Sequence, residues 1–286
     1  MVYLQSIVFP DAERETSFIL GEKRTCYDSF YPFKVLSARG LERLDFEPVT
    51  LLCGGNGSGK TTALNVIAER LGASRSSAFN KSSFFADYVG LCRVRTRGAA
   101  AACRILTSDD VFDYMLDVRC LNEGIDRRRE DLFQEYLDAR YAHFQLKSME
   151  DYDELKKSNL AKSKTQSRFV RSMLMDNAPE RSNGESAFAY FIQRIGENGL
   201  FLLDEPENSL SPARQMELAE FLQNSARFFG CQFIISTHSP FLLAMRHARI
   251  YDLDADPAAV RDWTQLAHVR AYYDFFRKHS DEFERI

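Results

Sequence analysis

The chain has 286 residues, and its 37 basic and 41 acidic side chains give a net charge of −4. This length predicts about two domains, or one large α/β domain that carries an insertion. With 45% hydrophobic and 27% charged residues, the composition excludes a wholly disordered chain, a collagen and a coiled-coil rod. The acidic balance excludes a protein that coats nucleic acid through overall positive charge, but it leaves room for a local basic face.

The sequence shows no signal for a membrane or for secretion. No stretch approaches 18 consecutive apolar residues, so no membrane span is expected. The start MVYLQSIVFPDAERE lacks the basic and apolar regions of a secretory signal. The six cysteines include no C-x-x-C pair and are expected to be reduced residues of the core. These features together predict a cytoplasmic protein.

Residues 1–48 have a mixed pattern with turn signals and are predicted to be rich in strands. An apolar run at 49–53 predicts a buried strand, and a glycine-rich segment follows it at once. The next residues have a helical period, in which Leu64 and Ile67 share one face and Gly72 is placed to end the helix. The unit is therefore a strand, a glycine-rich loop and a helix.

The glycine-rich segment matches the pattern G-x-x-x-x-G-K-[ST] in full. Its glycines let backbone N–H groups approach a polyphosphate, and the following helix directs its positive end at the phosphates. A chance lysine in a glycine-rich turn is the alternative, but the flanking strand and helix favour an ATP site that uses Mg²⁺. The expected nucleotide-binding residues here are Gly54, Gly55, Asn56, Gly57, Ser58, Gly59, Lys60, Thr61 and Thr62, with Thr61 also a Mg²⁺ ligand.

A second strand–helix–strand pattern lies in the C-terminal half. Residues 200–203 form a buried-strand run, Ser211-Pro212 begins a helix, and CQFIIST at 231–237 is another buried strand. The helix is predicted to bury Met216, Ala219, Leu222, Ala226 and Phe229. Continuous apolar strands alternating with helices predict a parallel sheet with helices on its faces.

The segment between roughly 110 and 180 is charged, helical in period and without a strong strand. It predicts a helical subdomain inserted into the α/β core. The expected organisation is 1–109 for the first half of the core, 110–181 for the helical subdomain and 182–286 for the second half.

Two adjacent acids, Asp204 and Glu205, end the apolar strand at 200–203. Because successive side chains of a strand point to opposite sides, the two acids are expected to do different work. By analogy with phosphate-loop ATPases, Asp204 is expected to face the Mg²⁺ held by Thr61, and Glu205 to act as the base for the attacking water. A solvated acidic turn is the alternative.

At this point the chain resembles the head of an ABC-class ATPase. The matching motifs are the lysine loop, Ser182-Asn183-Gly184-Glu185-Ser186, which lies 22 residues before Asp204, the loop that follows the acid pair, and Thr237-His238-Ser239-Pro240. The sequences of these motifs resemble those of soluble ABC ATPases of the RecF, SMC and overcoming-lysogeny group. They also resemble those of small standalone bacterial ATPases linked with DNA repair or phage defence.

The resemblance implies an α/β P-loop fold and a homodimer that forms on ATP binding. In such heads the signature, here Ser182, Asn183, Gly184 and Glu185, caps the γ-phosphate of the partner's nucleotide. His238 is then a γ-phosphate contact, and the catalytic residues are Glu205, His238 and Lys60. A helix cap is the alternative for the signature, and a buried core histidine is the alternative for His238.

The chain departs from the family pattern at one position. No glutamine occurs from Thr61 through Phe133, whereas many ABC ATPases place one there to help hold Mg²⁺ and water. Ser108 or Asp109, after the strand-like ACRIL at 102–106, is the positional equivalent, with a helix cap as the alternative. Tyr31 and Phe33 are candidates to stack on adenine, although core packing is favoured for both.

Two stretches, 92–104 and 156–175, are basic and contain no acid. The part at 156–171 is a candidate nucleic-acid contact, with a solvated helical face as the alternative. Only 48 residues follow His238, too few for a separate nuclease domain, so a partner protein such as a nuclease or toxin effector is expected. The alternative functions are the ATP-binding subunit of a membrane transporter and a low-turnover nucleotide sensor that restrains a toxin.

Overall fold

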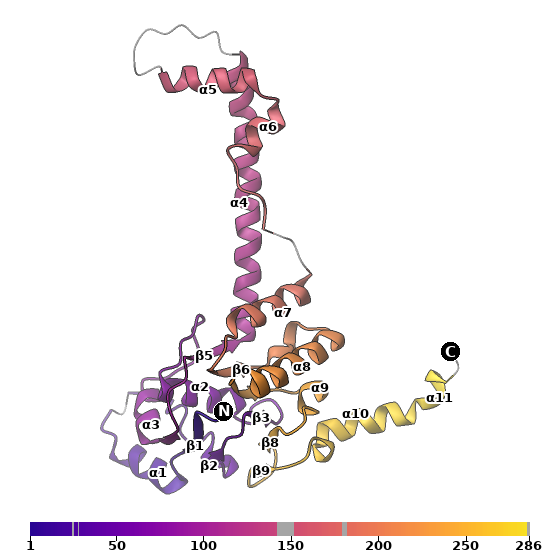
Figure 1. Cartoon of the computed structure of the whole chain (residues 1–286). Coiled ribbons are helices and arrows are strands. Elements are labelled where there is room, and N and C mark those ends of the chain that lie inside the picture. The colour runs from indigo at the N-terminus through magenta and orange to yellow at the C-terminus, as the bar shows by residue number, and fades with distance from the viewer. Residues whose placement is uncertain (25, 28, 142–151, 179–181, 285–286) are drawn as a thin grey trace. The chain divides into compact units, whose positions relative to one another are not determined.

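The computed structural model (Figure 1) describes residues 1–24, 26–27, 29–141, 152–178 and 182–284. The chain forms two compact units. Unit 1 combines Met1–Val111 with Asn183–Ile286, and unit 2 consists of Phe112–Ser182. The predicted helical insertion also covers 142–151 and 179–181, which lie outside the described residues.

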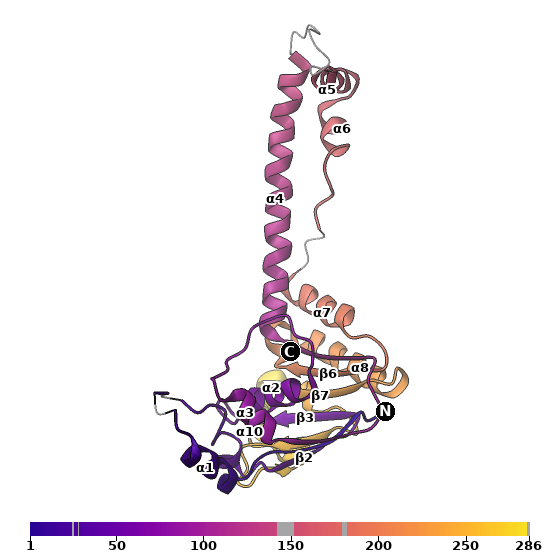
Figure 2. The same cartoon turned by 90° about the vertical axis from the view of Figure 1, so that its left-hand side faces the viewer.

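A six-stranded sheet forms the centre of unit 1 (Figure 2). Its order is β5-β6-β7-β3-β8-β9, and only β9 runs antiparallel to its neighbour. The predicted parallel sheet is therefore confirmed. The strands span Val49–Cys53 (β3), Ala102–Thr107 (β5), Gly199–Asp204 (β6), Gln232–Ser236 (β7), Arg249–Asp252 (β8) and Ala259–Val260 (β9).

Helices cover the two faces of this sheet. Helix α2 (Lys60–Leu71) packs against β5, β6 and β7, and Gly72 ends it in the left-handed conformation, as predicted. Helix α8 (Pro212–Phe228) begins at the predicted cap, where the Ser211 side chain accepts from Arg214 N–H, and it packs against β7. The buried face of α8 differs from the prediction, however. It consists of Leu218, Ala219, Leu222 and Ser225, while Met216 and Phe229 are exposed.

Residues 1–48 contain less strand than predicted. Strands β1 (Leu4–Val8) and β2 (Arg43–Asp45) join β4 (Arg93–Thr96) in a three-stranded antiparallel sheet. Helix α1 (Ala12–Gly21) lies between the first two strands, and its buried Glu15 accepts hydrogen bonds from Lys34 N–H and the Ser37 hydroxyl. The sequence did not reveal this helix because its contacts are made with residues about twenty positions away.

Gln232 of β7 joins the two sheets. Its side chain is fully buried, accepts from the N–H groups of Tyr3 and Leu4, and donates to the Leu4 carbonyl. An amide side chain here satisfies backbone groups at the start of β1 and of the residue before it, which would otherwise be buried without partners.

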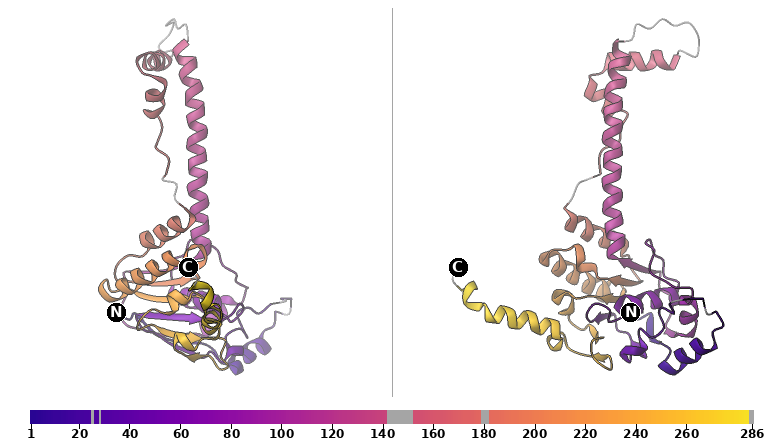
Figure 3. Two further views of the ribbon diagram at one scale, coloured as in Figure 1. Left: turned by 90° about the vertical axis from the view of Figure 1, so that its right-hand side faces the viewer. Right: turned by 180° about the vertical axis from the view of Figure 1, so that it is seen from behind.

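Unit 2 is helical, as expected for the insertion (Figure 3). Helix α4 (Ser108–Tyr141) starts in unit 1, and α5 (Tyr152–Ser163) and α6 (Gln166–Arg171) follow it. The views agree that α5 and α6 lie beside α4. Their small core consists of Leu132, Tyr136, Ala161, Phe169 and Val170.

The remaining helices of unit 1 include α10 (Ala267–Lys278) and α11 (Ser280–Phe283), which extend away from the sheet (Figure 1). No helix among the described residues is both long enough and apolar enough to cross a membrane. Short 3₁₀ segments lie at Ser37–Arg39, Pro206–Ser209 and Trp263–Gln265. The other α-helices of the described residues are α3 (Phe85–Leu91), α7 (Asn183–Arg194) and α9 (Pro240–Leu243).

The cysteines correct the expectation of six core residues. Cys53, Cys92 and Cys231 are buried, but Cys26 and Cys120 are exposed. All six thiols are free.

Replacing Gln232 should destabilise unit 1. In Gln232→Leu the buried N–H groups of Tyr3 and Leu4 lose their acceptor, at about 1–3 kcal/mol each, so we expect the free energy of unfolding to fall by about 2–6 kcal/mol. Urea denaturation measures this change. Gln193→Leu, at an exposed position of α7, is the matched control, and an equal effect of both variants would contradict the joining role.

Candidate functional site

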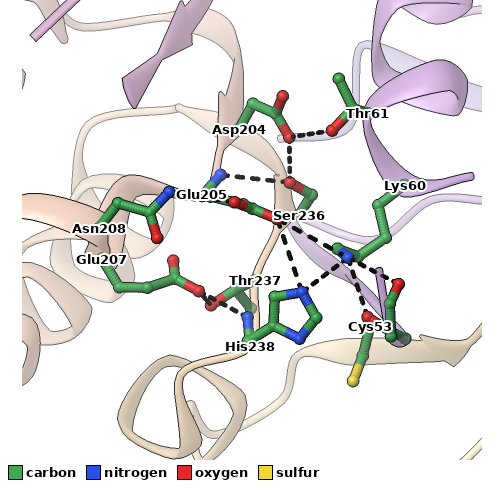
Figure 4. A network of polar contacts seen from close by, with 12 residues as sticks. Cys53, Lys60, Thr61, Asp204, Glu205, Glu207, Asn208, Ser236, Thr237 and His238 are labelled. Carbon is green, nitrogen blue, oxygen red and sulfur yellow. Dashed lines mark hydrogen bonds and ion pairs between the residues drawn. The ribbon is translucent and has the colours of Figure 1, made fainter. Parts of the chain in front are cut away.

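Three parallel strands bring the predicted residues together at the carboxyl ends of the strands. Strand β7 lies between β3 and β6, so the loop after β3, the acids that end β6 and the loop after β7 are neighbours (Figure 4). In the register of β6 with β7, Asp204 lies beside Ser236. The carboxyl ends of parallel strands are the usual place for a ligand in an α/β sheet.

The loop between β3 and α2 has the backbone of an anion cradle. Gly57 and Gly59 have φ values of 78° and 96°, which non-glycine residues rarely adopt. A Cβ on Gly59 would also lie 3.0 Å from the Leu36 side chain. Gly59 caps α2 without a side-chain acceptor, so the first N–H groups of the helix remain available for an anion.

Lys60 is the charged centre of the site. Its side chain is only 4% exposed, and its ammonium donates to the carbonyls of Gly54 and Gly55 at 2.9 and 3.3 Å. It also lies 2.8 Å from Nε2 of His238 and 3.7 Å from a carboxylate oxygen of Glu205. A buried ammonium with mainly neutral partners is poorly compensated, and an anion beside it would be strongly stabilised.

Asp204 lies next to Thr61, as predicted for a shared cation. The Thr61 hydroxyl donates to Asp204 Oδ1 at 3.1 Å, and the Ser236 hydroxyl donates to the same oxygen. Burial raises the pKa of Asp204, although both hydrogen bonds act in the opposite direction. A buried carboxylate beside a hydroxyl offers the hard oxygen atoms that Mg²⁺ prefers.

Glu205 is held in a strained backbone conformation. Its φ of 47° is unusual for a non-glycine residue and is of the kind that accumulates at functional sites. Its N–H donates to Ser236, and its carboxylate accepts from Asn208 Nδ2 at 3.0 Å. The other carboxylate oxygen lies 3.5 Å from His238 Nε2. Both acids of the pair therefore face the lysine loop side of the site.

Glu207 fixes the loop that carries His238. One of its carboxylate oxygens accepts from the N–H groups of His238 and Ser239, at 2.6 and 3.2 Å, and from the Thr237 hydroxyl at 2.8 Å. Burial raises the pKa of Glu207, and these donors oppose the rise. Glu207 therefore holds the loop that carries His238 by accepting hydrogen bonds from the backbone of that loop.

The surroundings of His238 favour its neutral form. Burial, followed by the positive charge of Lys60, lowers its pKa, and in the neutral tautomer with the proton on Nδ1 the Nε2 atom can accept from the ammonium. The His238 ring also packs edge-to-face on His268, with 6.3 Å between ring centroids. His268 belongs to α10 and lies 3.8 Å from the thiol sulfur of Cys53, whose pKa burial raises to about 12.

The signature residues 182–185 do not belong to the described lining of the phosphate-loop pocket. Ser182, Asn183 and Glu185 are exposed, and α7 begins at Asn183. A Cβ on Gly184 would lie 3.4 Å from the Ser209 carbonyl, so α7 starts close to the loop after the acid pair. The described lining of the phosphate-loop pocket, about 260 Å³ in volume, includes none of the signature residues; it is Asn56, Gly57, Gly59, Lys60, Thr61, Thr62 and Glu205.

The candidate replacements for the missing glutamine form a helix start instead. Thr107 N–H donates to the Asp110 carboxylate, and Asp110 N–H donates back to the Thr107 hydroxyl. Ser108 opens α4, and Asp109 is exposed. The cap alternative therefore describes this segment.

The two aromatic candidates have different surroundings. Phe33 is 5% exposed and stacks on Phe18, so it belongs to the core. Tyr31 is partly exposed, and its hydroxyl lies 3.0 Å from that of Thr62. Only Tyr31 touches a residue that lines the pocket.

Sequence reasoning missed four residues that shape the site. No role was predicted for Ser236 or Glu207, although both lie in segments that had been recognised. His268 and Asp254, whose carboxylate accepts from Gly55 N–H at 2.7 Å, come from the C-terminal region. The alternation of strand residues could have indicated Ser236, but nothing in the sequence relates His268 or Asp254 to the loop at 54–61.

Comparison with protein families gives one match over residues 68–244, more than half of the chain. The matching model is described as "AAA domain, putative AbiEii toxin, Type IV TA system". The chain belongs to this family. Because the match begins inside α2, the phosphate loop lies before it and is identified by its own sequence and geometry. Comparison with curated proteins gives no match.

Solved structures similar to the chain include two SMC head domains and an ATP-binding cassette. An SMC head domain from Pyrococcus furiosus, bound to a ScpA domain, is 13% identical (97% of this chain, 100% of that one, TM-score 0.44). The SMC head domain from Thermotoga maritima is 13% identical (91% and 98%, TM-score 0.37). A dimeric ATP-binding cassette bound to ADP and phosphate is 14% identical (77% and 88%, TM-score 0.38). These low scores transfer no residue role to this member of the AAA domain family.

The predicted fold class is confirmed in this AAA domain family member. It is an α/β P-loop fold with a largely parallel sheet and an inserted helical segment. The strand, loop and helix at Val49–Leu71 and the acid-ended β6 are the parts that define it.

Removing the Glu207 carboxylate should loosen the His238 loop. In Glu207→Ala the buried N–H groups lose their acceptor, and we expect unfolding free energy to fall by about 2–4 kcal/mol. Glu207→Gln keeps one carbonyl acceptor and should lose less than half as much. Urea denaturation measures both, with Glu220→Ala on the exposed side of α8 as control; equal losses for Ala and Gln would contradict this account.

Proposed function

We propose that the chain is an ATPase that binds ATP with Mg²⁺ and hydrolyses it to ADP and phosphate. The observation that carries the proposal is the single pocket in which Lys60 and Thr61 of the loop meet Glu205, with Asp204 bonded to Thr61. A phosphate-binding loop, a cation-binding pair and a base are the parts that phosphoryl transfer to water requires.

The residues present fit the nucleotide and the metal. The side-chain oxygen of Ser58 in the loop is buried without a hydrogen-bond partner among the described residues, and the uncapped start of α2 offers further donors. Lys60 would hold the phosphates, and Thr61 with Asp204 would hold Mg²⁺. The cation, when bound, supplies positive charge that stabilises the phosphate oxygens.

Three side chains would act on the attacking water. Glu205 would accept its proton, because this carboxylate faces the lysine and belongs to the pocket lining. Asn208 orients that carboxylate through its hydrogen bond. His238, held neutral and fixed by Glu207, would donate or accept one hydrogen bond near the terminal phosphate.

The functional form is proposed to be a homodimer that closes on ATP. The signature residues 182–185 are largely exposed and absent from the described lining of their own chain's pocket, which supports a role on the partner's nucleotide. The exposed start of a helix can supply the N–H groups and hydroxyl for this. The sequence resemblance implies the same arrangement.

The biological output is proposed to pass to another molecule, in DNA repair or antiviral defence. The family description, which names a toxin, is compatible with a partner nuclease or toxin effector. The basic stretch at 156–171 remains a predicted nucleic-acid contact. Its charge is partly compensated in the fold, because Lys157 pairs with Glu135 of α4. A transporter subunit and a low-turnover sensor remain the alternatives.

Glu205→Gln should separate binding from hydrolysis. Removing the base should lower the rate of ATP hydrolysis by about 10²–10⁴-fold, while ATP affinity stays within about threefold because the loop residues are intact. Phosphate release and fluorescent-nucleotide titration measure the two. Glu220→Gln, an exposed acid of α8, is the matched control, and an unchanged rate in Glu205→Gln would refute its role as base.

Mixing two inactive variants should restore activity if the site is shared between chains. Lys60→Ala removes the loop lysine, and Ser182→Arg blocks the signature, so each homodimer is expected to be inactive. In the mixed dimer one composite site keeps an intact lysine and an intact signature. We expect ATPase activity to appear on mixing and to depend on protein concentration. Activity no greater than the sum of the separate variants would contradict the proposed dimer.

A further inference from the structure

A second pocket lies at the free edge of the six-stranded sheet. Strand β5 is the outermost strand on this side, and Ser74, after α2, pairs with Arg104 of β5 in a parallel bridge. The pocket beside this bridge has a volume of about 220 Å³ and shares no lining residue with the phosphate-loop pocket. It belongs entirely to unit 1.

Three arginines from separate segments line this pocket. Arg75 follows α2, Arg104 belongs to β5, and Arg194 is in the last turn of α7. None of the three forms an ion pair with a carboxylate of the described residues. Guanidinium groups gathered in one pocket repel one another, and the arrangement becomes favourable when an anion neutralises them. Ser74 and Ser76 also line the pocket, and the Ser74 hydroxyl donates to the Cys103 carbonyl at 3.2 Å.

Arg75 has two buried N–H donors without a hydrogen-bond acceptor among the described residues. Its Nη2 donates to Asn65 of α2 at 2.6 Å, and its guanidinium lies 3.8 Å from the centre of the Phe79 ring. Its Nε and Nη1 atoms are buried and have no hydrogen-bond partner among the described residues. Unpaired buried donors of a charged group are costly, so these two N–H groups define where an anion would bind.

The acids near Arg75 are already engaged or distant. Asp110 accepts from the N–H groups of Ser77 and Thr107, and Asp204 accepts from the hydroxyls described above. Burial lowers the pKa of Arg75, although Glu69, Asp110 and Asp204 act in the opposite direction. None of these three acids forms an ion pair with Arg75 among the described residues, so its guanidinium is compensated only from a distance.

We propose that this pocket binds a phosphate group, carried either by a nucleic-acid backbone or by a free phosphorylated molecule. Arg75, Arg104 and Arg194 provide planar donors that suit phosphate oxygens. A bound phosphate would contact α7 through Arg194, and Arg75 would link it to α2 through the hydrogen bond to Asn65.

The test uses the Lys60→Ala chain, so that anion binding by the phosphate loop is weakened. Isothermal titration calorimetry measures pyrophosphate binding, and fluorescence anisotropy measures a short labelled single-stranded oligonucleotide, both at low salt. Into this chain we would introduce Arg104→Gln with Arg194→Gln, or Arg246→Gln as the matched control. Arg246 is exposed and lies between α9 and β8, outside the pocket.

Each pocket arginine should contribute about tenfold or more to affinity, so the double variant should lose about a hundredfold while the Arg246 control stays within about twofold. Loss for pyrophosphate alone identifies a free phosphorylated ligand, and loss for the oligonucleotide identifies a nucleic-acid backbone. If the double variant fails to fold, Ser76→Asp, which adds a negative charge at an exposed lining position, should give the same loss. Unchanged affinity in the pocket variants, or no binding of either probe to the Lys60→Ala chain, would overturn the proposal.

Discussion

The parallel register of β6, β7 and β3 is the constraint on which the site depends. These strands end at the same edge of the sheet, so a lysine, an acid pair and a histidine that are far apart in the sequence become neighbours. Residues 60 and 238 are 178 positions apart, yet the Lys60 ammonium and the His238 ring are in hydrogen-bond contact. A one-residue shift of β6 against β7 would move Asp204 to the opposite face of the sheet, away from Thr61.

The charges at the carboxyl ends of these strands favour the binding of an anion. Lys60 is nearly enclosed and bonds to backbone carbonyls, while Glu205 is strained and makes only a longer contact with it. Such an arrangement holds the lysine in position without neutralising it fully. Three arginines likewise line the pocket beside β5 without forming an ion pair among the described residues. The two proposed anion sites would therefore both belong to unit 1.

Much of this could be predicted because it is local in the sequence. The loop Gly54–Thr61, the acids that end β6, the Ser211 cap and the strand at Gln232–Ser236 each follow from short patterns with a direct physical cause. The parallel sheet followed from the same apolar runs.

The rest depends on contacts that no short pattern contains. Glu207 acts through backbone N–H groups across a turn, Gln232 pairs with the first strand, and His268 reaches the site from a helix near the C-terminus. The buried face of α8 was misplaced for a related reason, since the choice between Ser225 and Ala226 is made by the sheet against which the helix packs.

The central claim is that Lys60, Thr61 and Asp204 form the phosphate and metal site of an ATPase. A structure determined with Mg²⁺ and a non-hydrolysable ATP analogue tests it most directly. The account predicts that the Lys60 ammonium leaves the carbonyls of Gly54 and Gly55 for the phosphates, and that the cation lies between Thr61 and Asp204. An analogue bound elsewhere, with Lys60 still on those carbonyls, would contradict it.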